Sequence, residues 1–178
     1  MKELLEQLRA YTTIDNTEGI IKARFIDFVN TNHDCFERTL LIGHITASGF
    51  IYDEGTQKIL LIHHKKLDKW LQPGGHCDGD KDTLGVAIKE VFEETGVQIE
   101  NIGQSIFDLD IHTIPERKDI PEHEHFDVRY LFFADSTKQL VQNHETNQLM
   151  WIRIADLEKY TTEESLLRMK RKVLSLEY

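Results

Sequence analysis

Three glutamates gather on one short stretch of the chain, just after a glycine-rich loop. Glu90, Glu93 and Glu94 stand at positions i, i+3 and i+4, so on an α-helix their side chains share one face and point back toward that loop. Like charges on adjacent turns repel one another by roughly 0.2–0.5 kcal/mol per pair, and a bound divalent cation would remove this repulsion. The cluster therefore predicts a metal site, with a solvated acidic helix face as the alternative.

A helix over residues 83–95 would carry these glutamates. Asp82 is a suitable N-cap because its side chain can accept a hydrogen bond from the first turn, and Gly96 is typical of the position just beyond a helix end. The predicted buried stripe, on the side away from the glutamates, consists of Leu84, Ala87, Ile88, Val91 and Thr95. Core packing and chemistry are thus expected on different faces of this helix.

At these residues the chain resembles the Nudix hydrolase family. The family signature reads Gly, five residues, Glu, seven residues, Arg-Glu, apolar, any residue, Glu-Glu, any residue, Gly, apolar. With Gly75 as its first glycine, the chain matches this signature at Glu90, Val91, Glu93, Glu94, Gly96 and Val97. Lys81 replaces the first glutamate and Lys89 replaces the arginine. The similarity covers about residues 40–157, including the run Trp-Leu-Gln-Pro-Gly-Gly-His that ends at His76.

The resemblance implies a hydrolase that uses Mg²⁺, or alternatively Mn²⁺, when water attacks the phosphorus of a nucleoside diphosphate linked to another moiety. By position, Glu90 and Glu94 would bind the metal ion, Glu93 would be a further ligand or the general base, and the Gly75 carbonyl another ligand. Glu145 or a carboxylate of residues 121–125 is an alternative general base. The substrate contacts implied are Trp70, Gln72, Gly74, Gly75, His76 and His125. Carboxylate oxygens are also the ligands that Mg²⁺ prefers.

The two lysines leave a second function open. Lys89 keeps a cation that can pair with Glu93 one turn later, but it lacks the bidentate fork of arginine, so we expect weaker orientation of the carboxylates and modest activity. Lys81 reverses a charge, although Asp80 and Asp82 flank it. A catalytically weak or inactive module of the same fold that binds or senses a nucleotide is the alternative. Isomerisation of a diphosphate would need a catalytic cysteine, for which Cys77 gives little support.

Periodicity predicts the remaining elements. Residues 2–11 and 17–30 are expected to form two helices, residues 161–178 a final helix opened by the capping-box pattern Thr161-x-x-Glu164, and residues 44–53 and 58–63 a β-hairpin. Further strands are expected at residues 106–112, with Phe107, Leu109 and Ile111 inward, at 126–134 and at 150–154. These elements favour one α/β domain, a Nudix-like α/β/α sandwich with a mixed β-sheet between helices. Its parts would be a helical extension (1–38), the core (40–157) and the last helix.

Composition limits the partners and the setting. With 178 residues and a formal net charge of −10, the chain is a poor candidate for binding duplex nucleic acid. It has no membrane-spanning run and no secretory signal, so we expect a cytoplasmic protein whose partner is a small nucleoside diphosphate derivative. The apolar faces of the first two helices could also form a homodimer interface.

Several smaller motifs allow more than one interpretation. The His123-Glu124-His125 run could bind a metal ion or a substrate phosphate, but we favour a polar loop. Trp70 could stack on a nucleobase or pack against the sheet, and the basic residues at 63–69 could hold a phosphate or be solvated. Cys77 is interpreted as an inert small residue, since no base partners it.

Overall fold

The structure, a computed structural model, describes residues 1–103, 105–117, 120–144 and 146–176. Contacts between Cα atoms divide the chain into two compact units. Unit 1 comprises Met1–Ser48, Gly75–Ala87 and Gln104–Tyr130, and unit 2 comprises Gly49–Gly74, Ile88–Gly103 and Leu131–Tyr178. At residues 48–49, 74–75, 87–88 and 130–131 the chain passes between the units inside a strand or helix, so these elements are divided between the units. The single domain expected from the sequence stays a prediction.

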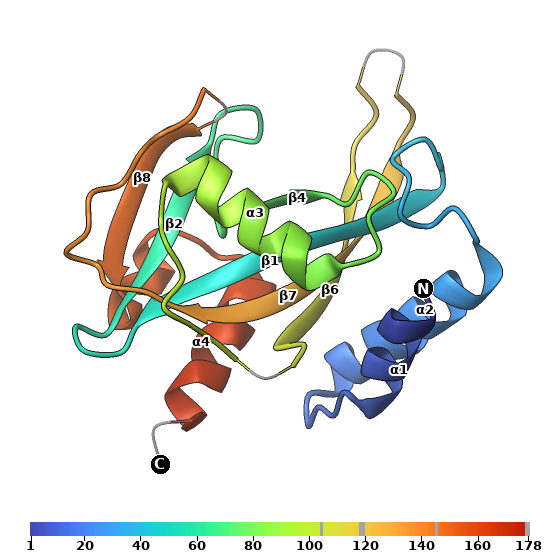
Figure 1. The fold of residues 1–178 in the computed structure, drawn as a ribbon, viewed down its shortest axis with the longest axis horizontal. Coiled ribbons are helices and arrows are strands. Elements are labelled where there is room, and N and C mark those ends of the chain that lie inside the picture. Colours follow the sequence, from blue (N-terminus) through green and yellow to red (C-terminus); the bar gives the residue numbers. More distant parts are fainter. Residues whose placement is uncertain (104, 118–119, 145, 177–178) are drawn as a thin grey trace. The chain divides into compact units, whose positions relative to one another are not determined.

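Helices precede, interrupt and follow the strands, as the α/β class requires (Figure 1). The helices are α1 (Lys2–Ala10), α2 (Asn16–Thr31), α3 (Thr83–Thr95) and α4 (Glu164–Leu176), with a 3-10 helix η1 (Ile154–Lys159). The strands are β1 (Gly43–Asp53), β2 (Lys58–His64), β3 (Lys69–Leu71), β4 (Gly74–His76), β5 (Asn101–Ile102), β6 (Asp108–Ile114), β7 (His123–Phe133) and β8 (Thr146–Arg153).

The first two helices pack within unit 1, where α1 contacts α2 and α2 contacts β6 (Figure 1). Both helices end within one residue of the predicted positions. Phe25 and Phe28 of α2 pack on Phe126 of β7, with ring centroids 5.3 Å and 3.8 Å away. Ile20 of α2 is exposed, whereas the buried apolar residues of the two helices are Leu4, Leu8, Phe25, Phe28 and Val29. Dimerisation through these helices stays a prediction.

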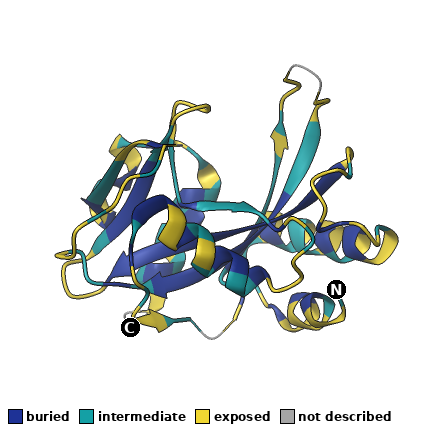
Figure 2. Cartoon of the chain, turned by 45° about the horizontal axis from the view of Figure 1, so that its top comes forward, coloured by how far each residue is buried: buried dark blue, intermediate teal, exposed yellow. Residues whose placement is uncertain are grey.

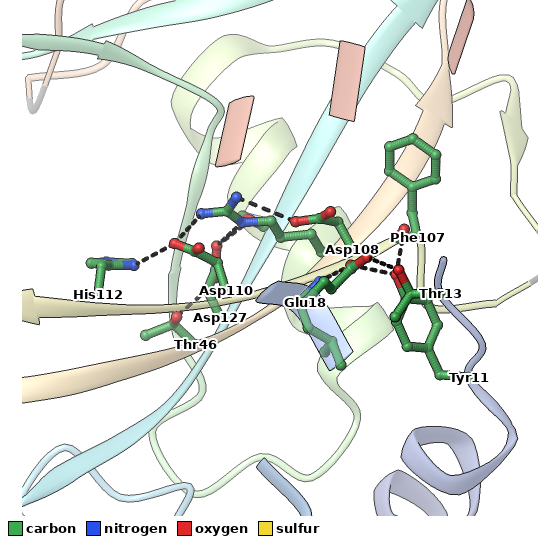
Figure 3. A network of polar contacts seen from close by, with 12 residues as sticks. Tyr11, Thr13, Glu18, Thr46, Phe107, Asp108, Asp110, His112 and Asp127 are labelled. Carbon is green, nitrogen blue, oxygen red and sulfur yellow. Dashed lines mark hydrogen bonds and ion pairs between the residues drawn. The ribbon is translucent and has the colours of Figure 1, made fainter. Parts of the chain in front are cut away.

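A buried carboxylate joins α2 to β6. Asp15 caps α2 by accepting the Glu18 N–H at 2.9 Å. The Glu18 side chain, with 0 % of its surface exposed, accepts the Leu109 N–H at 3.1 Å and the hydroxyl protons of Tyr11 and Thr13 (Figure 3). These donors satisfy a charge that would otherwise be costly to bury, since an unpaired carboxylate loses its hydration. Glu18 therefore fixes the helices against the strand.

Three charged residues on β6 and β7, Asp108, Asp127 and Arg129, are buried, which the sequence did not predict. The strands pair antiparallel with Asp108 opposite Arg129 and Asp110 opposite Asp127. The Arg129 guanidinium, 3 % exposed, donates to Asp127 at 2.8 Å and to Asp110 at 3.0 Å, and lies 3.5 Å from Asp108 (Figure 3). Burial acts to lower the pKa of Arg129, but the three carboxylates outweigh it and raise that pKa.

The expected inward face of β6 is therefore only partly correct. Leu109 is fully buried, but Phe107 and Ile111 are half-buried, while Asp108 has no exposed surface. The physical reason is that alternation shows which residues share a face but not whether the second face is also covered. Here ion pairing allows that second face to be buried.

Unit 2 contains β2, β3, β5 and β8, and the parts of β1 and β7 that follow Ser48 and Tyr130. Strands follow the order β3-β2-β1-β7-β5, and β8 pairs antiparallel with β2 along seven residue pairs. The predicted hairpin is confirmed, since Tyr52 pairs with Ile59 and Asp53 with Lys58. Every residue of β1 is buried, as the dark strand in Figure 2 shows. Polar residues of β1 are buried together with the apolar ones, and the Thr46 and Ser48 hydroxyls donate to the Asp127 carboxylate at 3.0 Å and 2.8 Å.

The predicted helix over residues 83–95 is confirmed as α3, and its end signals behave as expected. The Asp82 side chain accepts the Gly85 N–H at 2.9 Å, which is an N-cap contact. At the other end Gly96 adopts a φ of +70°, the left-handed conformation that ends a helix, and donates its N–H to Phe92 at 2.8 Å. Local signals thus position the acidic helix.

The carboxy-terminal helix begins one turn later than the capping-box pattern suggests. Helix α4 starts at Glu164, and the Thr161 hydroxyl accepts the N–H of Glu163 at 3.1 Å rather than that of Glu164. Leu166, Met169 and Val173 are buried as expected. Within the described residues, every helix is too short or too polar to cross a bilayer.

We predict that Gly96→Ala destabilises the protein by about 1–3 kcal/mol. A Cβ atom at this position would lie 2.7 Å from Cβ of Val141, and the left-handed φ adds backbone strain. Gly19→Ala is the matched control, because its Cβ would meet nothing within 4 Å and alanine favours the interior of a helix. Urea unfolding monitored by circular dichroism measures both. Equal midpoints for the two variants would contradict the role given to Gly96.

Candidate active site

The acidic face of α3 lies in unit 2 and presents its three carboxylates in different environments. The Glu90 side chain is 19 % exposed and the Glu93 side chain 53 % exposed. Glu94 is buried. The ammonium of Lys89 lies 3.7 Å from Glu90 and 3.3 Å from Glu93. The three carboxylates therefore differ in exposure: Glu94 is buried, Glu90 is half-buried and Glu93 is exposed to solvent. Lys89 interacts with both Glu90 and Glu93.

Glu94 connects the helix to the glycine-rich segment, whose residues Gly74–His76 form strand β4 rather than the loop expected from the sequence. Its Oε2 atom accepts the backbone N–H of Gly74 at 2.9 Å. This bond uses one of the roughly four lone-pair sites of a carboxylate. The bond also sets the position of Gly74 relative to the helix, as the adjacency of the two motifs in the sequence predicts.

Lys89 behaves as a local counter-charge. Its hydrogen bond to Glu93 raises its pKa, and the charge of Glu90 adds to this effect. The predicted pairing of Lys89 with Glu93 is confirmed. A single ammonium acts as a point charge, so it cannot hold both carboxylates in one plane as a guanidinium fork can.

The other predicted site residues fall into separate groups. Gly75, His76, Lys81 and His125 belong to unit 1, and Glu145 lies outside the described residues. Lys81 is exposed ahead of α3. The role of Gly75 as a metal ligand and the role of Glu145 as a general base therefore stay predictions.

Trp70 and Gln72 lie in unit 2 near the end of β3. The Trp70 ring is 5.0 Å from the His63 ring and meets Tyr160 edge-on at 5.8 Å. Trp70, Tyr160 and a Lys69–Glu163 ion pair line a small surface hollow. Lys69 is thus engaged by a carboxylate, which weakens the idea that the basic run is a free phosphate site. Trp70 has aromatic partners, in agreement with a packing role.

The cysteines are chemically quiet. Cys35 and Cys77 are both free and buried. Burial raises the pKa of the Cys35 thiol to about 11 and that of Cys77 further still, where Asp127 adds to the effect. A thiol in this state is a poor nucleophile, which supports the interpretation of Cys77 as an inert residue and argues against isomerase chemistry.

The His123-Glu124-His125 run is not a loop but the start of β7, which corrects the prediction. It pairs with β6, so that Ile114 lies opposite His123 and His112 opposite His125. In unit 1 these residues gather with His44 and His76, and His44 was not singled out from the sequence. A period-two pattern of polar residues, His123, His125, Asp127 and Arg129, was the signal that could have revealed this strand face.

Comparisons with known proteins agree with this geometry. Residues 43–173 match the family described as NUDIX domain. A relative from Lactococcus lactis subsp. cremoris, named "Probable DHNTP pyrophosphohydrolase", is 29 % identical over 132 residues, which are 73 % of this chain and 77 % of the relative. A solved hydrolase of the NUDIX family from Clostridium perfringens superposes with a TM-score of 0.56 at 26 % identity, covering 75 % of this chain and 97 % of the other.

A third structure, the NUDIX domain of Shewanella oneidensis NrtR complexed with ADP ribose, has a TM-score of 0.58 at 17 % identity and covers 85 % of this chain and 97 % of that one. It supports the fold alone. The chain belongs to the Nudix family. It is a Nudix-type pyrophosphohydrolase, and the predicted α/β fold with a mixed sheet and two additional amino-terminal helices is confirmed.

We predict that Glu94→Ala and Glu94→Gln differ in stability. Alanine leaves the Gly74 N–H without its acceptor and should cost about 1–3 kcal/mol, whereas glutamine keeps an oxygen of the same reach and should stay within about 1 kcal/mol of the parent. Urea unfolding in the presence of a chelator measures this difference without any contribution from metal binding. Equal losses for both variants would show that the Gly74 bond is not what Glu94 supplies to the fold.

Proposed function

We propose that the chain hydrolyses the pyrophosphate bond of a nucleoside diphosphate linked to another moiety, or of a related organic pyrophosphate, with Mg²⁺ as cofactor. The observation that carries this proposal is the placement of Glu94, a buried carboxylate bonded to Gly74 of the glycine-rich segment, one turn after the half-buried Glu90. Two carboxylates on one face of a rigid helix are the hard oxygen ligands that Mg²⁺ requires.

The roles follow from the environments of the side chains. Glu90 and Glu94 would hold the metal ion, which when bound polarises phosphate oxygens and acidifies a water molecule. Glu93, the most exposed of the three, is a further ligand or the base that accepts the proton from that water. Lys89 orients Glu93 through their ion pair. Gly74 contributes through its bond to Glu94, and Mn²⁺ is an alternative ion.

The substrate class is a small anhydride. The net charge of −10 disfavours long polyanions, since like charges repel. The name of the Lactococcus relative suggests DHNTP, and ADP-ribose is a nucleoside diphosphate linked to another moiety, as the proposed class requires. Trp70, Gln72, Gly75, His76 and His125 remain proposed substrate contacts. A panel of DHNTP, ADP-ribose and a dinucleoside polyphosphate, assayed for released phosphate or pyrophosphate, would identify the preferred leaving group.

We predict that Glu94→Gln lowers kcat for the best substrate of this panel by roughly 100-fold or more, because a neutral amide is a poor Mg²⁺ ligand. Adding excess EDTA to the parent should have the same effect. Glu100→Gln, which changes an exposed glutamate after α3, is the control and should retain full activity. Unchanged turnover by Glu94→Gln would rule out the role given to this residue.

We also predict that Lys89→Arg lowers the Mg²⁺ concentration needed for half-maximal rate by about two- to five-fold, while Lys89→Met raises it. The range corresponds to an exposed ion pair of roughly 0.2–1 kcal/mol, because the Lys89 side chain is 62 % exposed. Magnesium titrations of initial rate at low salt provide the measurement. Identical magnesium titration curves for the parent and Lys89→Arg would mean that the bidentate geometry of a guanidinium at position 89 does not affect metal binding.

The nucleotide sensor is the second candidate, and the substitution at Lys89 is the feature that favours it. Its signature would be a ligand-induced rise in melting temperature with no product formed over many hours. The same panel of ligands and the same protein distinguish it from the hydrolase.

A further inference from the structure

Five histidines lie together in unit 1. The ring of His44 has its centroid 5.0 Å from that of His76, 5.1 Å from that of His123 and 4.8 Å from that of His125. The His112 ring is 5.4 Å from the His125 ring. Within the described residues, His44, His123 and His125 are the group whose ligand nitrogens all lie within 4.8 Å of one another. So many imidazoles on neighbouring strands call for a chemical explanation.

The pairing of β6 with β7 brings the rings of His112, His123 and His125 close together. His123 and His125 are two residues apart on β7, so their side chains leave the same face of the strand. His112 of β6 is directly opposite His125. The intervening residue, Glu124, forms a bidentate ion pair with Arg24 of α2, with both distances 2.8 Å. The cluster therefore offers imidazole nitrogens as ligands, whereas the neighbouring Glu124 carboxylate is bound to Arg24.

Three buried nitrogens of the cluster lack a hydrogen-bond partner among the residues that the structure describes. His44 is 2 % exposed, yet neither Nδ1 nor Nε2 forms a hydrogen bond to any part of the chain that the structure describes, and the same holds for His125 Nε2. Leaving such groups buried and unpaired costs roughly 1–3 kcal/mol each. These nitrogens belong to the cluster, so a ligand that accepts one lone pair from each ring would remove the cost for that nitrogen.

The ligand atoms of the cluster suit a cation rather than an anion. Each neutral imidazole offers one nitrogen lone pair, which a transition-metal ion accepts readily and a phosphate oxygen does not.

His123 is already in the ligating tautomer. Its Nδ1 lies 2.9 Å from the Pro121 carbonyl oxygen, and because a carbonyl only accepts, Nδ1 must carry the proton. The lone pair is then on Nε2. A backbone carbonyl holding the second nitrogen is the usual support for a metal-bound histidine. His112 has an analogous support, since its Nδ1 lies 3.3 Å from the Asp110 carboxylate.

We propose that His44, His123 and His125 form a binding site for a transition-metal ion, with Zn²⁺ as the natural occupant and His76 or a water molecule as a fourth ligand. Zn–N bonds of about 2.0–2.1 Å in a tetrahedron require nitrogens about 3.3 Å apart, so the rings must close in from their present spacing by side-chain rotation. The site differs from the glutamate face of α3 in its residues and in its ligand chemistry, nitrogen instead of oxygen.

The test uses the full chain after dialysis against a chelator. Zn²⁺ is titrated by calorimetry, and Co²⁺ is substituted so that its visible absorption reports four-coordinate nitrogen ligation. We expect one ion per chain, and a melting temperature about 5–10 °C higher at a zinc concentration 100 times Kd. Excess Mg²⁺ should not displace the ion. Absence of stoichiometric zinc binding by the parent protein would overturn the proposal without need of any variant.

Variants assign the ligands. His123→Asn and His125→Asn should each weaken zinc binding by about 100-fold or more, and folding of each is checked by its urea midpoint. His33→Asn, at an exposed histidine, and Glu94→Gln should bind zinc as the parent does. Parent-like zinc affinity of the two cluster variants, or loss of binding in Glu94→Gln, would place the ion elsewhere and overturn the proposal. A changed KM with unchanged zinc affinity in His125→Asn would do the same, in favour of a substrate contact.

Discussion

The buried guanidinium of Arg129 is the constraint on which much of unit 1 depends. Arginine keeps its proton inside a protein, so its burial demands nearby carboxylates, which here come from Asp108, Asp110 and Asp127. These contacts require the observed pairing of β6 with β7, because a slip of one residue would turn each side chain to the opposite face. The same register puts His112 opposite His125. One ion network thus determines where the histidines meet.

The chain separates hard and borderline ligands. In unit 2 the carboxylates of α3 offer oxygen, and Glu94 serves both the fold, through Gly74, and the proposed chemistry. In unit 1 the strands offer imidazole nitrogen. Metal selectivity in proteins depends on ligand type and geometry rather than on affinity alone, so two ions of different preference can be bound by one chain without exchanging places.

Sequence reasoning succeeded where signals are local. Asp82 and Gly96 mark the ends of α3, and its face with Glu90 and Glu94 follows from helical spacing alone. It failed where the answer depends on partners distant in sequence. The His123–His125 run forms a strand because β6 pairs with it. Asp108 can be buried because it interacts with Arg129, and Glu18 can be buried because it accepts the Leu109 N–H. Polarity suggested exposure for those carboxylates, and tertiary pairing overrode it.

The Glu18 contact has a consequence for where this protein can be divided. Similarity to the family begins at residue 43, which makes the first two helices look like a detachable addition. Yet the carboxylate on α2 receives the Leu109 N–H of β6, and Phe25 and Phe28 cover Phe126 of β7. A cut at the family boundary would strip an acceptor and an aromatic layer from the core. The evolutionary unit and the energetic unit of this chain therefore have different starting points.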